Sequence, residues 1–170
     1  LQEAGMSESE AGALLNDARA LCRERILRDS GIPMVSLKKY QKAGIVDPEE
    51  FCTLHPVYIS SRTGIRLDTV YKHVEKVCSF LGRRSPEKIG QAAVERGRKD
   101  LLRIPGIGEK TLESLYRAGI VDPDGLARAD PEQVSIQSGI PINALNEYIL
   151  ALKRSSRTEP AGPAGQAATR

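Results

Sequence analysis

The sequence predicts an all-α protein, and three observations lead to this fold class. Aromatic residues make up only 4% of the 170 residues and tryptophan is absent, so the composition typical of strand-rich proteins is missing. Apolar residues recur at helical spacing through most of the chain. Proline and glycine separate these stretches into short helices, and one block of sequence occurs twice.

An internal repeat divides the chain into similar units. Residues 43–48 read AGIVDP, and residues 118–123 repeat this block without change. Aligning the two blocks needs no gap on either side and pairs apolar with apolar positions, which indicates duplication of one structural unit. The alignment also matches two glycine–isoleucine pairs, Gly31-Ile32 with Gly106-Ile107 and Gly64-Ile65 with Gly139-Ile140.

The first predicted helix runs from Ser7 to about Arg28. Ser7 is a suitable N-cap and Glu10 follows three residues later, which is the pattern of a capping box. The apolar face of this helix contains Leu14, Leu15, Ala18, Leu21 and Cys22. The chain starts without methionine, which favours a fragment of a longer protein. We therefore expect Gly5-Met6 to be a hairpin turn and residues 1–25 to be the C-terminal half of a truncated repeat.

Each full unit, residues 26–81 and residues 99–154, is predicted to contain four or five short helices. In the second unit we expect helices at 99–103 and about 109–118, a short helix that begins at Pro123, and helices at 131–137 and 142–153. Gly119 is expected to end one of them. Asp122-Pro123 and Asp130-Pro131 suit helix starts, because Asp caps the first amides and Pro fits the first helical position.

Residues 82–98 are predicted to form a basic helical linker. Ser85 and Pro86 are typical of a helix start, and the helix should continue to about Arg96. Seven basic residues lie between Arg83 and Arg103, against three acidic ones. A solvated helix face explains this excess as well as a surface that follows phosphates. Residues 155–170 are small, polar and rich in Pro and Gly, so we expect a disordered tail.

The turn that precedes residue 109 is the best candidate site. Pro105 should end the incoming helix, because proline pushes the preceding residue out of the α region. Gly106 and Gly108 allow a sharp turn around Ile107, whose side chain should point inward. Backbone N–H groups at the start of the next helix can then bind an anion, with Lys110 beside them. The large polyanion that fits is a nucleic-acid backbone.

Pro105-Gly106-Ile107-Gly108, followed by Lys110, Leu112 and Leu115, resembles the hairpin of the helix-hairpin-helix family. Two hairpins joined by a short helix resemble the tandem, five-helix, SAM-domain-like form, which is similar to the C-terminal domain of the RNA polymerase alpha subunit and the N-terminal domain of archaeal recombinases. The resemblance covers most of residues 1–154. It implies DNA-phosphate contact without sequence readout, in a non-catalytic accessory module of a topoisomerase, helicase or repair enzyme.

The four hairpin turns are not equally suited to phosphate. Pro33 stands where Gly108 stands in the other unit and has no N–H to donate. Val35 replaces Lys110, and Pro141 follows the Gly139 turn. The Gly64 turn keeps its donor and ranks second. The predicted nucleic-acid-binding residues are Gly106, Ile107, Gly108, Lys110, Thr111, Arg103, Arg62, Gly64, Arg66, Arg96, Arg98 and Lys99.

The sequence does not favour catalysis, a metal or a cofactor. Three cysteines without a CxxC pair favour a reduced, intracellular chain with buried thiols and argue against zinc. His55 is expected to have a capping or surface role, and His73 is expected to pack at a helix edge. P-loop, GxSxG and dinucleotide fingerprints are missing from the sequence. Lys110 would need burial to act as a Schiff-base lysine, and this turn is expected to be exposed.

Two functions are left open by these observations. The first is a sequence-independent DNA-binding module, in the cytoplasm with the nucleoid or in a eukaryotic nucleus. Duplex, junction, single strand and RNA are all possible ligands, and a net charge of +3 permits each of them. The second is a protein-interaction module on the same fold, favoured by the prolines in two hairpins. No membrane partner is expected, because no apolar run is long enough to span a bilayer.

Overall fold

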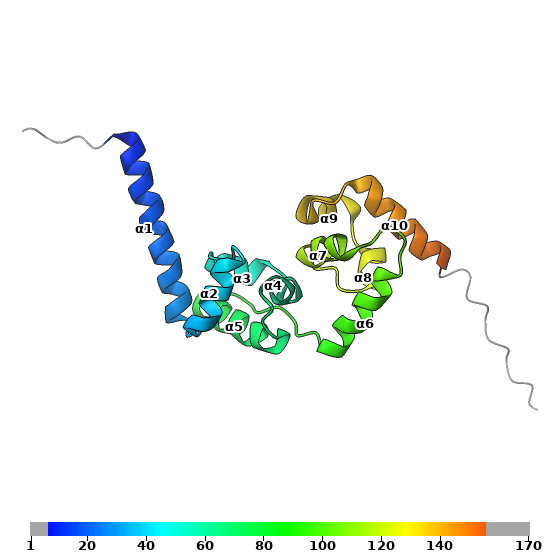
Figure 1. The fold of residues 1–170 in the computed structure, drawn as a ribbon, viewed down its shortest axis with the longest axis horizontal. Coiled ribbons are helices and arrows are strands. Elements are labelled where there is room, and N and C mark those ends of the chain that lie inside the picture. The colour runs from blue at the N-terminus through cyan, green and yellow to red at the C-terminus, as the bar shows by residue number, and fades with distance from the viewer. Residues whose placement is uncertain (1–6, 156–170) are drawn as a thin grey trace, which may run out of the picture. The chain divides into compact units, whose positions relative to one another are not determined.

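The computed structural model describes residues 7–155, which contain ten helices and no strand, so the all-α prediction is confirmed. The chain divides into two compact units, with the boundary between residues 91 and 92 (Figure 1). Unit 1 contains α1 (Glu8–Asp29), α2 (Met34–Lys42), α3 (Pro48–Thr53), α4 (Pro56–Thr63) and α5 (Leu67–Phe80). Unit 2 contains α6 (Gln91–Leu102), α7 (Glu109–Arg117), α8 (Pro123–Arg128), α9 (Pro131–Ser138) and α10 (Ile142–Ser155).

The ends of the helices follow the expected signals. Ser7 and Glu10 form a complete capping box on α1. Asp47, Asp122 and Asp130 cap their helices, each with proline at the first position. His55 caps α4, because its Nδ1 accepts from the Val57 amide at 3.3 Å. The turn predicted at Gly5-Met6 lies outside the described residues. So does the predicted tail, except for Ser155, which is the last residue of α10.

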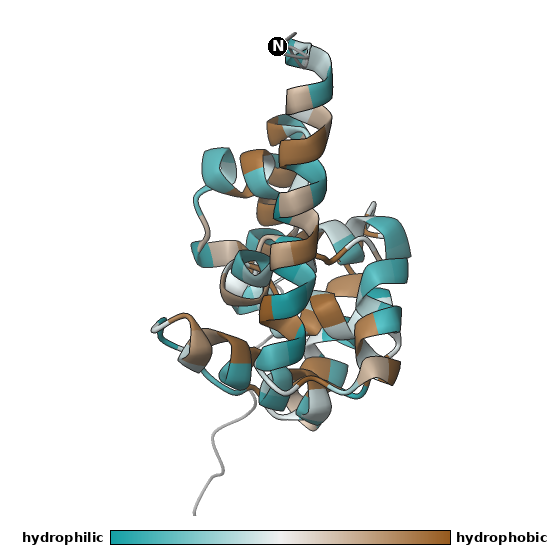
Figure 2. Cartoon of the chain, turned by 90° about the vertical axis from the view of Figure 1, so that its left-hand side faces the viewer, coloured by the Kyte–Doolittle hydropathy of each residue, from teal (hydrophilic) through white to brown (hydrophobic). Residues whose placement is uncertain are grey.

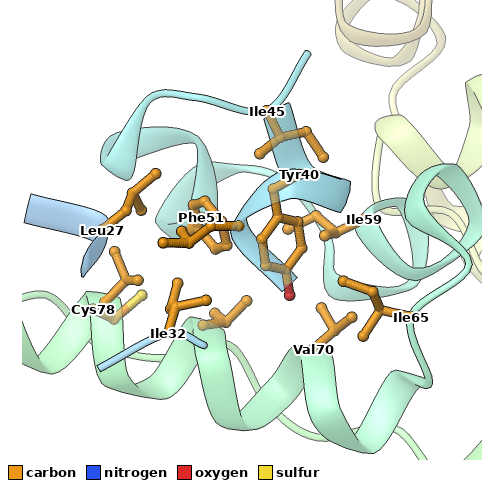
Figure 3. Packing of buried hydrophobic residues seen from close by; sticks show 12 residues of the cluster. Leu27, Ile32, Tyr40, Ile45, Phe51, Ile59, Ile65, Val70 and Cys78 are labelled. Carbon is orange, nitrogen blue, oxygen red and sulfur yellow. The ribbon is translucent and has the colours of Figure 1, made fainter. Parts of the chain in front are cut away.

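The core of unit 1 is centred on Tyr40 and Phe51, whose rings meet edge to face with centroids 4.9 Å apart (Figure 3). His73 lies inside this core and not at the helix edge that the sequence predicts. Its Nδ1 is 2.8 Å from the Tyr40 hydroxyl, which satisfies both buried groups. Burial, and to a smaller extent the nearby Lys76, lowers the pKa of His73.

The duplication extends to individual hydrogen bonds. In unit 1, the Ser60 hydroxyl donates to the Ile65 carbonyl oxygen at 2.7 Å across the α4–α5 turn. In unit 2, Ser135 makes the same bond to Ile140, also at 2.7 Å. Gly64 and Gly139 both adopt left-handed backbone angles at these turns, with φ of 65° and 74°. The two units therefore share side-chain contacts that close the second hairpin in the same way.

The apolar face of α1 is exposed. Leu14, Leu15 and Leu21 are 60%, 54% and 69% exposed, and Leu27 is the buried residue of this helix. Figure 2 shows apolar residues along the part of α1 that extends from the rest of unit 1. Cys22 lies on the same face and is exposed, so the expectation of buried thiols is wrong for this cysteine. The helix also runs without interruption across the boundary expected at residues 25 and 26.

The predicted helix start at Ser85 is wrong, because residues 83–90 are not helical. The Ile89 amide donates to the Tyr71 hydroxyl at 2.9 Å, and Lys88 pairs with Glu75 at 3.2 Å. Both contacts tie this segment to α5, and the bond to Tyr71 takes up the Ile89 amide, which a helix that starts at Ser85 would need. The basic helix of this region is instead α6, which begins at Gln91.

α6 joins two helices that the sequence predicts as separate. Gly97 lies in the middle of α6 and is buried. A Cβ atom at this position would overlap the Val121 carbonyl oxygen and lie 3.1 Å from the Asp122 Cβ. The glycine therefore allows α6 to pack directly on the backbone that leads into α8, so it serves helix packing and does not end the helix.

Candidate nucleic-acid interface

The turn between α6 and α7 has the conformation expected of the first hairpin. Its Gly106 has a φ of 88°, which favours glycine. Ile107 is only 6% exposed, and its amide donates to the Ile104 carbonyl oxygen at 3.1 Å. Pro105, Gly106, Gly108 and Lys110 are exposed. One buried side chain thus fixes a turn whose backbone faces solvent.

The start of α7 presents backbone amides that bind nothing in the described part of the chain. The first helical bond is from the Leu112 amide to the Gly108 carbonyl oxygen at 2.8 Å. Among residues 7–155, no hydrogen bond reaches the amides of Gly108, Glu109, Lys110 or Thr111, and Gly108 caps the helix without a side chain. Such donors, at the positive end of a helix dipole, are suited to an anion.

The other side of the hairpin is held by α10. The Tyr148 hydroxyl donates to the Gly106 carbonyl oxygen at 3.1 Å. In unit 1, Lys76 of α5 makes the corresponding bond to the Gly31 carbonyl oxygen at 3.0 Å. In both units, a side chain of the last helix therefore donates a hydrogen bond to the first hairpin. The donor is a tyrosine hydroxyl in unit 2 and a lysine ammonium group in unit 1. Sequence reasoning missed these contacts because they join opposite ends of each unit and share no motif.

Two of the predicted basic residues near the hairpin are engaged in ion pairs. The Arg98 guanidinium pairs with the Glu109 carboxylate, and this contact raises the pKa of Arg98. Arg103 pairs with Asp100 at 3.0 Å. Both pairs are partly exposed, so each contributes little to stability and can open for a competing anion. The Glu109 carboxylate lies at the start of α7, where a phosphate would bind. Its negative charge therefore disfavours the binding of a phosphate at these amides.

The remaining basic residues of α6 are Arg96 and Lys99, which lie three positions apart on the exposed side of the helix. Val94, Gly97 and Leu101 mark the buried face of this helix. Lys99 lies about opposite to this face, as follows from the helical repeat of about 3.6 residues, and Arg96 is also exposed. Lys110 and Lys99 are thus exposed cations without an ion pair in the described residues, whereas Arg98 is the member of the cluster that reaches the hairpin.

The first hairpin of unit 1 has different chemistry. Its N-cap is Pro33, and the next two residues, Met34 and Val35, are 48% and 72% exposed. Val35 therefore presents an apolar side chain where unit 2 presents Lys110. Compared with the α6–α7 hairpin, this turn loses one N–H at Pro33 and the cation at position 35, and it exposes hydrophobic surface there.

The second hairpin of unit 1 lies beside a basic depression. Gly64 and Arg66 are exposed at the α4–α5 turn. Arg62 lines a shallow depression together with Lys39 and Lys42 from the end of α2, and with Ala43 and Thr63. The two lysines are not among the predicted site residues. They belong to a different helix from Arg62, and only the packing of α2 on α4 brings the three cations together.

The helix–turn–helix pairs of unit 2, with a glycine-framed turn and a second hairpin at Gly139, define the helix-hairpin-helix class. Residues 98–153 match the family model described as a SAM-like helix-hairpin-helix tandem, which covers about a third of the chain. The predicted family is thus confirmed for this segment. Domains of this class commonly bind DNA. No curated protein and no solved structure shows a significant match to the chain.

Two further properties concern residues 7–155. No group of His, Cys, Asp and Glu side chains in this range is arranged to hold a metal ion. None of the helices in this range combines the length and apolar character needed to cross a membrane.

Proposed function

We propose that this chain is a sequence-independent DNA-binding module and that the α6–α7 hairpin is its main phosphate site. The observation that supports this most directly is that, within residues 7–155, the amides from Gly108 to Thr111 form no hydrogen bond and lie next to the exposed Lys110. The hairpin of the Gly64 turn, with Arg62 and Arg66, is the second contact. The module would act as an accessory part of a larger DNA-processing protein such as a topoisomerase, helicase or repair enzyme.

The proposed contact explains both the affinity and the lack of sequence preference. A phosphate oxygen at the start of α7 accepts from backbone amides, and Lys110 adds a point charge. The Thr111 hydroxyl is a further donor. These groups contact the sugar-phosphate backbone and do not contact base edges, and phosphate contacts carry no direct sequence information. With about three phosphate contacts, affinity should fall roughly 10- to 50-fold between 50 and 200 mM salt.

Charge changes at the hairpin should move DNA affinity in opposite directions. Lys110→Glu should weaken binding to any duplex about tenfold at low salt and lower the salt slope by about one. Glu109→Gln should strengthen binding several-fold, because it removes the competing carboxylate and releases Arg98. The measurement is fluorescence anisotropy with two duplexes of unrelated sequence over a salt series. Equal affinity for all three proteins, or a strong preference for one duplex, would contradict the proposed contact.

Exposed apolar surface on unit 1 favours a second candidate function, protein interaction. Leu14, Leu15 and Leu21 form a stripe on α1, and Met34 and Val35 are exposed at the first hairpin. The arginines in the last third of α1 pair with acidic residues of the same unit, Arg23 with Asp47, Arg25 with Asp29 and Arg28 with Glu24. The apolar stripe is therefore the feature that a partner would cover. The same stripe on a second copy can cover it in a two-fold contact, so the partner that we propose is a second copy.

Self-association should therefore depend on the apolar stripe of α1. The wild-type chain is expected to form dimers at about 100 μM, within the range of a weak protein contact, and Leu14→Glu with Leu21→Glu should leave monomers. Ile136→Glu is the matched control, because Ile136 is 84% exposed on the other unit. Light scattering after size exclusion measures the mass. A wild-type monomer at this concentration would rule out pairing through α1, and dimers of the double variant would place the contact elsewhere.

A further inference from the structure

Two thiols face each other in the core of unit 1. Cys52 of α3 and Cys78 of α5 are 26 positions apart in the sequence, and their Sγ atoms lie 2.7 Å apart. Both are free thiols, Cys78 is fully buried and Cys52 is half-buried. Figure 3 shows Cys78 pointing from α5 into the core, near Leu27. A disulfide bond is about 2.05 Å long, so the two sulfurs need to move less than about 1 Å to bond.

The helices that carry the two thiols are already held side by side. α3 and α5 pack against each other, and the Arg83–Glu49 ion pair, at 3.2 Å, joins the segment that follows α5 to α3. These contacts hold the two helices, and with them the two sulfurs, close together. When the two AGIVDP blocks are aligned, Ala127 and Lys153 stand in the corresponding positions of unit 2. The thiol pair is thus a property of one of the two units.

We propose that Cys52 and Cys78 are a modification site, at which a small-molecule disulfide such as oxidised glutathione converts the two thiols into a reversible intramolecular disulfide. Cys52 is the point of entry because it is the more accessible of the two. Its thiolate attacks one sulfur of the small disulfide, a mixed disulfide forms, and one thiolate leaves and takes up the proton that Cys52 lost.

The second step closes the bond inside unit 1. The Cys78 sulfur attacks the Cys52 sulfur, the second small thiol leaves, and the Cys78 proton goes with it. In total the cysteine pair loses two electrons and two protons, and the small disulfide gains them. Burial raises the pKa of Cys78 to about 12, so this thiol is rarely ionised and the second step is the slower one.

The disulfide should stabilise unit 1 and leave unit 2 unchanged. It closes a loop of about 25 residues, which restricts the unfolded chain and raises the melting temperature of unit 1 by roughly 10 °C. Hydrogen exchange followed by mass spectrometry separates the two units, because peptides from residues 26–81 should gain protection and peptides from residues 99–153 should not.

The experiment uses the full chain with Cys22→Ser, which removes the exposed third thiol. The protein is incubated in glutathione buffers of increasing oxidised fraction and quenched with N-ethylmaleimide. The expected result is loss of both alkylatable thiols together, with a cross-linked peptide that contains Cys52 and Cys78, reversed by dithiothreitol. Cys78→Ala should instead keep one glutathione on Cys52, and Cys52→Ala should react with none.

Two results would overturn the proposal. One is a folded protein that keeps both thiols alkylatable in the most oxidising buffer. The other is a mixed disulfide on Cys52 that persists although Cys78 is present. If the Cys78→Ala variant does not fold, the cross-linked peptide of the Cys22→Ser protein decides the question without it.

Discussion

Replacing Gly97 with alanine is expected to destabilise unit 2 strongly. Gly97 is buried in α6, and an added Cβ would overlap the Val121 carbonyl oxygen and crowd the Asp122 Cα and Cβ atoms. Two of these three atoms are backbone and the third is attached directly to it, at the N-cap of α8. They cannot move aside as the end of a flexible side chain can. The overlap should cost about 3 kcal/mol or more, which exceeds the roughly 1 kcal/mol that alanine gains in a helix.

For a unit of about 60 residues, this loss corresponds to a fall in melting temperature of roughly 10 to 15 °C. Hydrogen exchange should show loss of protection in α6 to α10 and unchanged protection in α2 to α5. Gly12→Ala is the matched control, since Gly12 is also helical and its Cβ would meet no atom within 4 Å. A Gly97→Ala protein as stable as Gly12→Ala would show that α6 does not pack on the α7–α8 connection.

Replacing Gly108 with valine is expected to abolish most DNA binding and to preserve the fold. Gly108 has extended backbone angles, φ −105° and ψ 179°, which any residue adopts, and a Cβ here would meet no atom within 4 Å. Pro33 at the same place in unit 1 shows that a side chain is tolerated at this N-cap. The valine should therefore cost about 1 kcal/mol of stability or less.

The same valine would stand where a phosphate must approach the amides that follow Gly108. Each lost hydrogen bond to a charged group is worth roughly 1.5 to 3 kcal/mol, so affinity should fall about 10- to 100-fold. Gly90→Val is the control, because a Cβ at Gly90 would also meet no atom within 4 Å. Anisotropy measures affinity and circular dichroism checks the fold. Gly108→Val that binds like Gly90→Val would remove this hairpin from the DNA contact.

Local chemistry made much of the fold predictable. The Asp-Pro pairs start α3, α8 and α9, and Gly119 follows α7, because caps depend on a few neighbouring residues. Ser85-Pro86 carries an equally good start signal, yet no helix begins there. Its failure has a tertiary cause, since the Tyr71 hydroxyl and Glu75 on α5 bind the segment that would have formed the first turns.

The candidate site was predictable in its centre and not at its edges. Ile107, Gly106 and Gly108 are contiguous, so their roles in the turn could be read from their order. The charge around this turn could not be predicted from the order of residues. Arg98 pairs with Glu109 only when α6 and α7 pack together. The gathering of Lys39 and Lys42 with Arg62 likewise needs α2 and α4 to meet.

By itself, the sequence determined the helical class, the duplication, the helix caps and the glycine-framed hairpin, because each depends on residues within a few positions of one another or on a direct match between two blocks. The tertiary structure alone decided that α6 continues through Gly97, that α1 leaves its leucines exposed and that Cys52 meets Cys78. These outcomes depend on which surfaces pack together across long stretches of chain. Which surfaces pack together is decided by steric fit and by the apolar area that becomes buried. Neither can be predicted from the order of residues along a single helix.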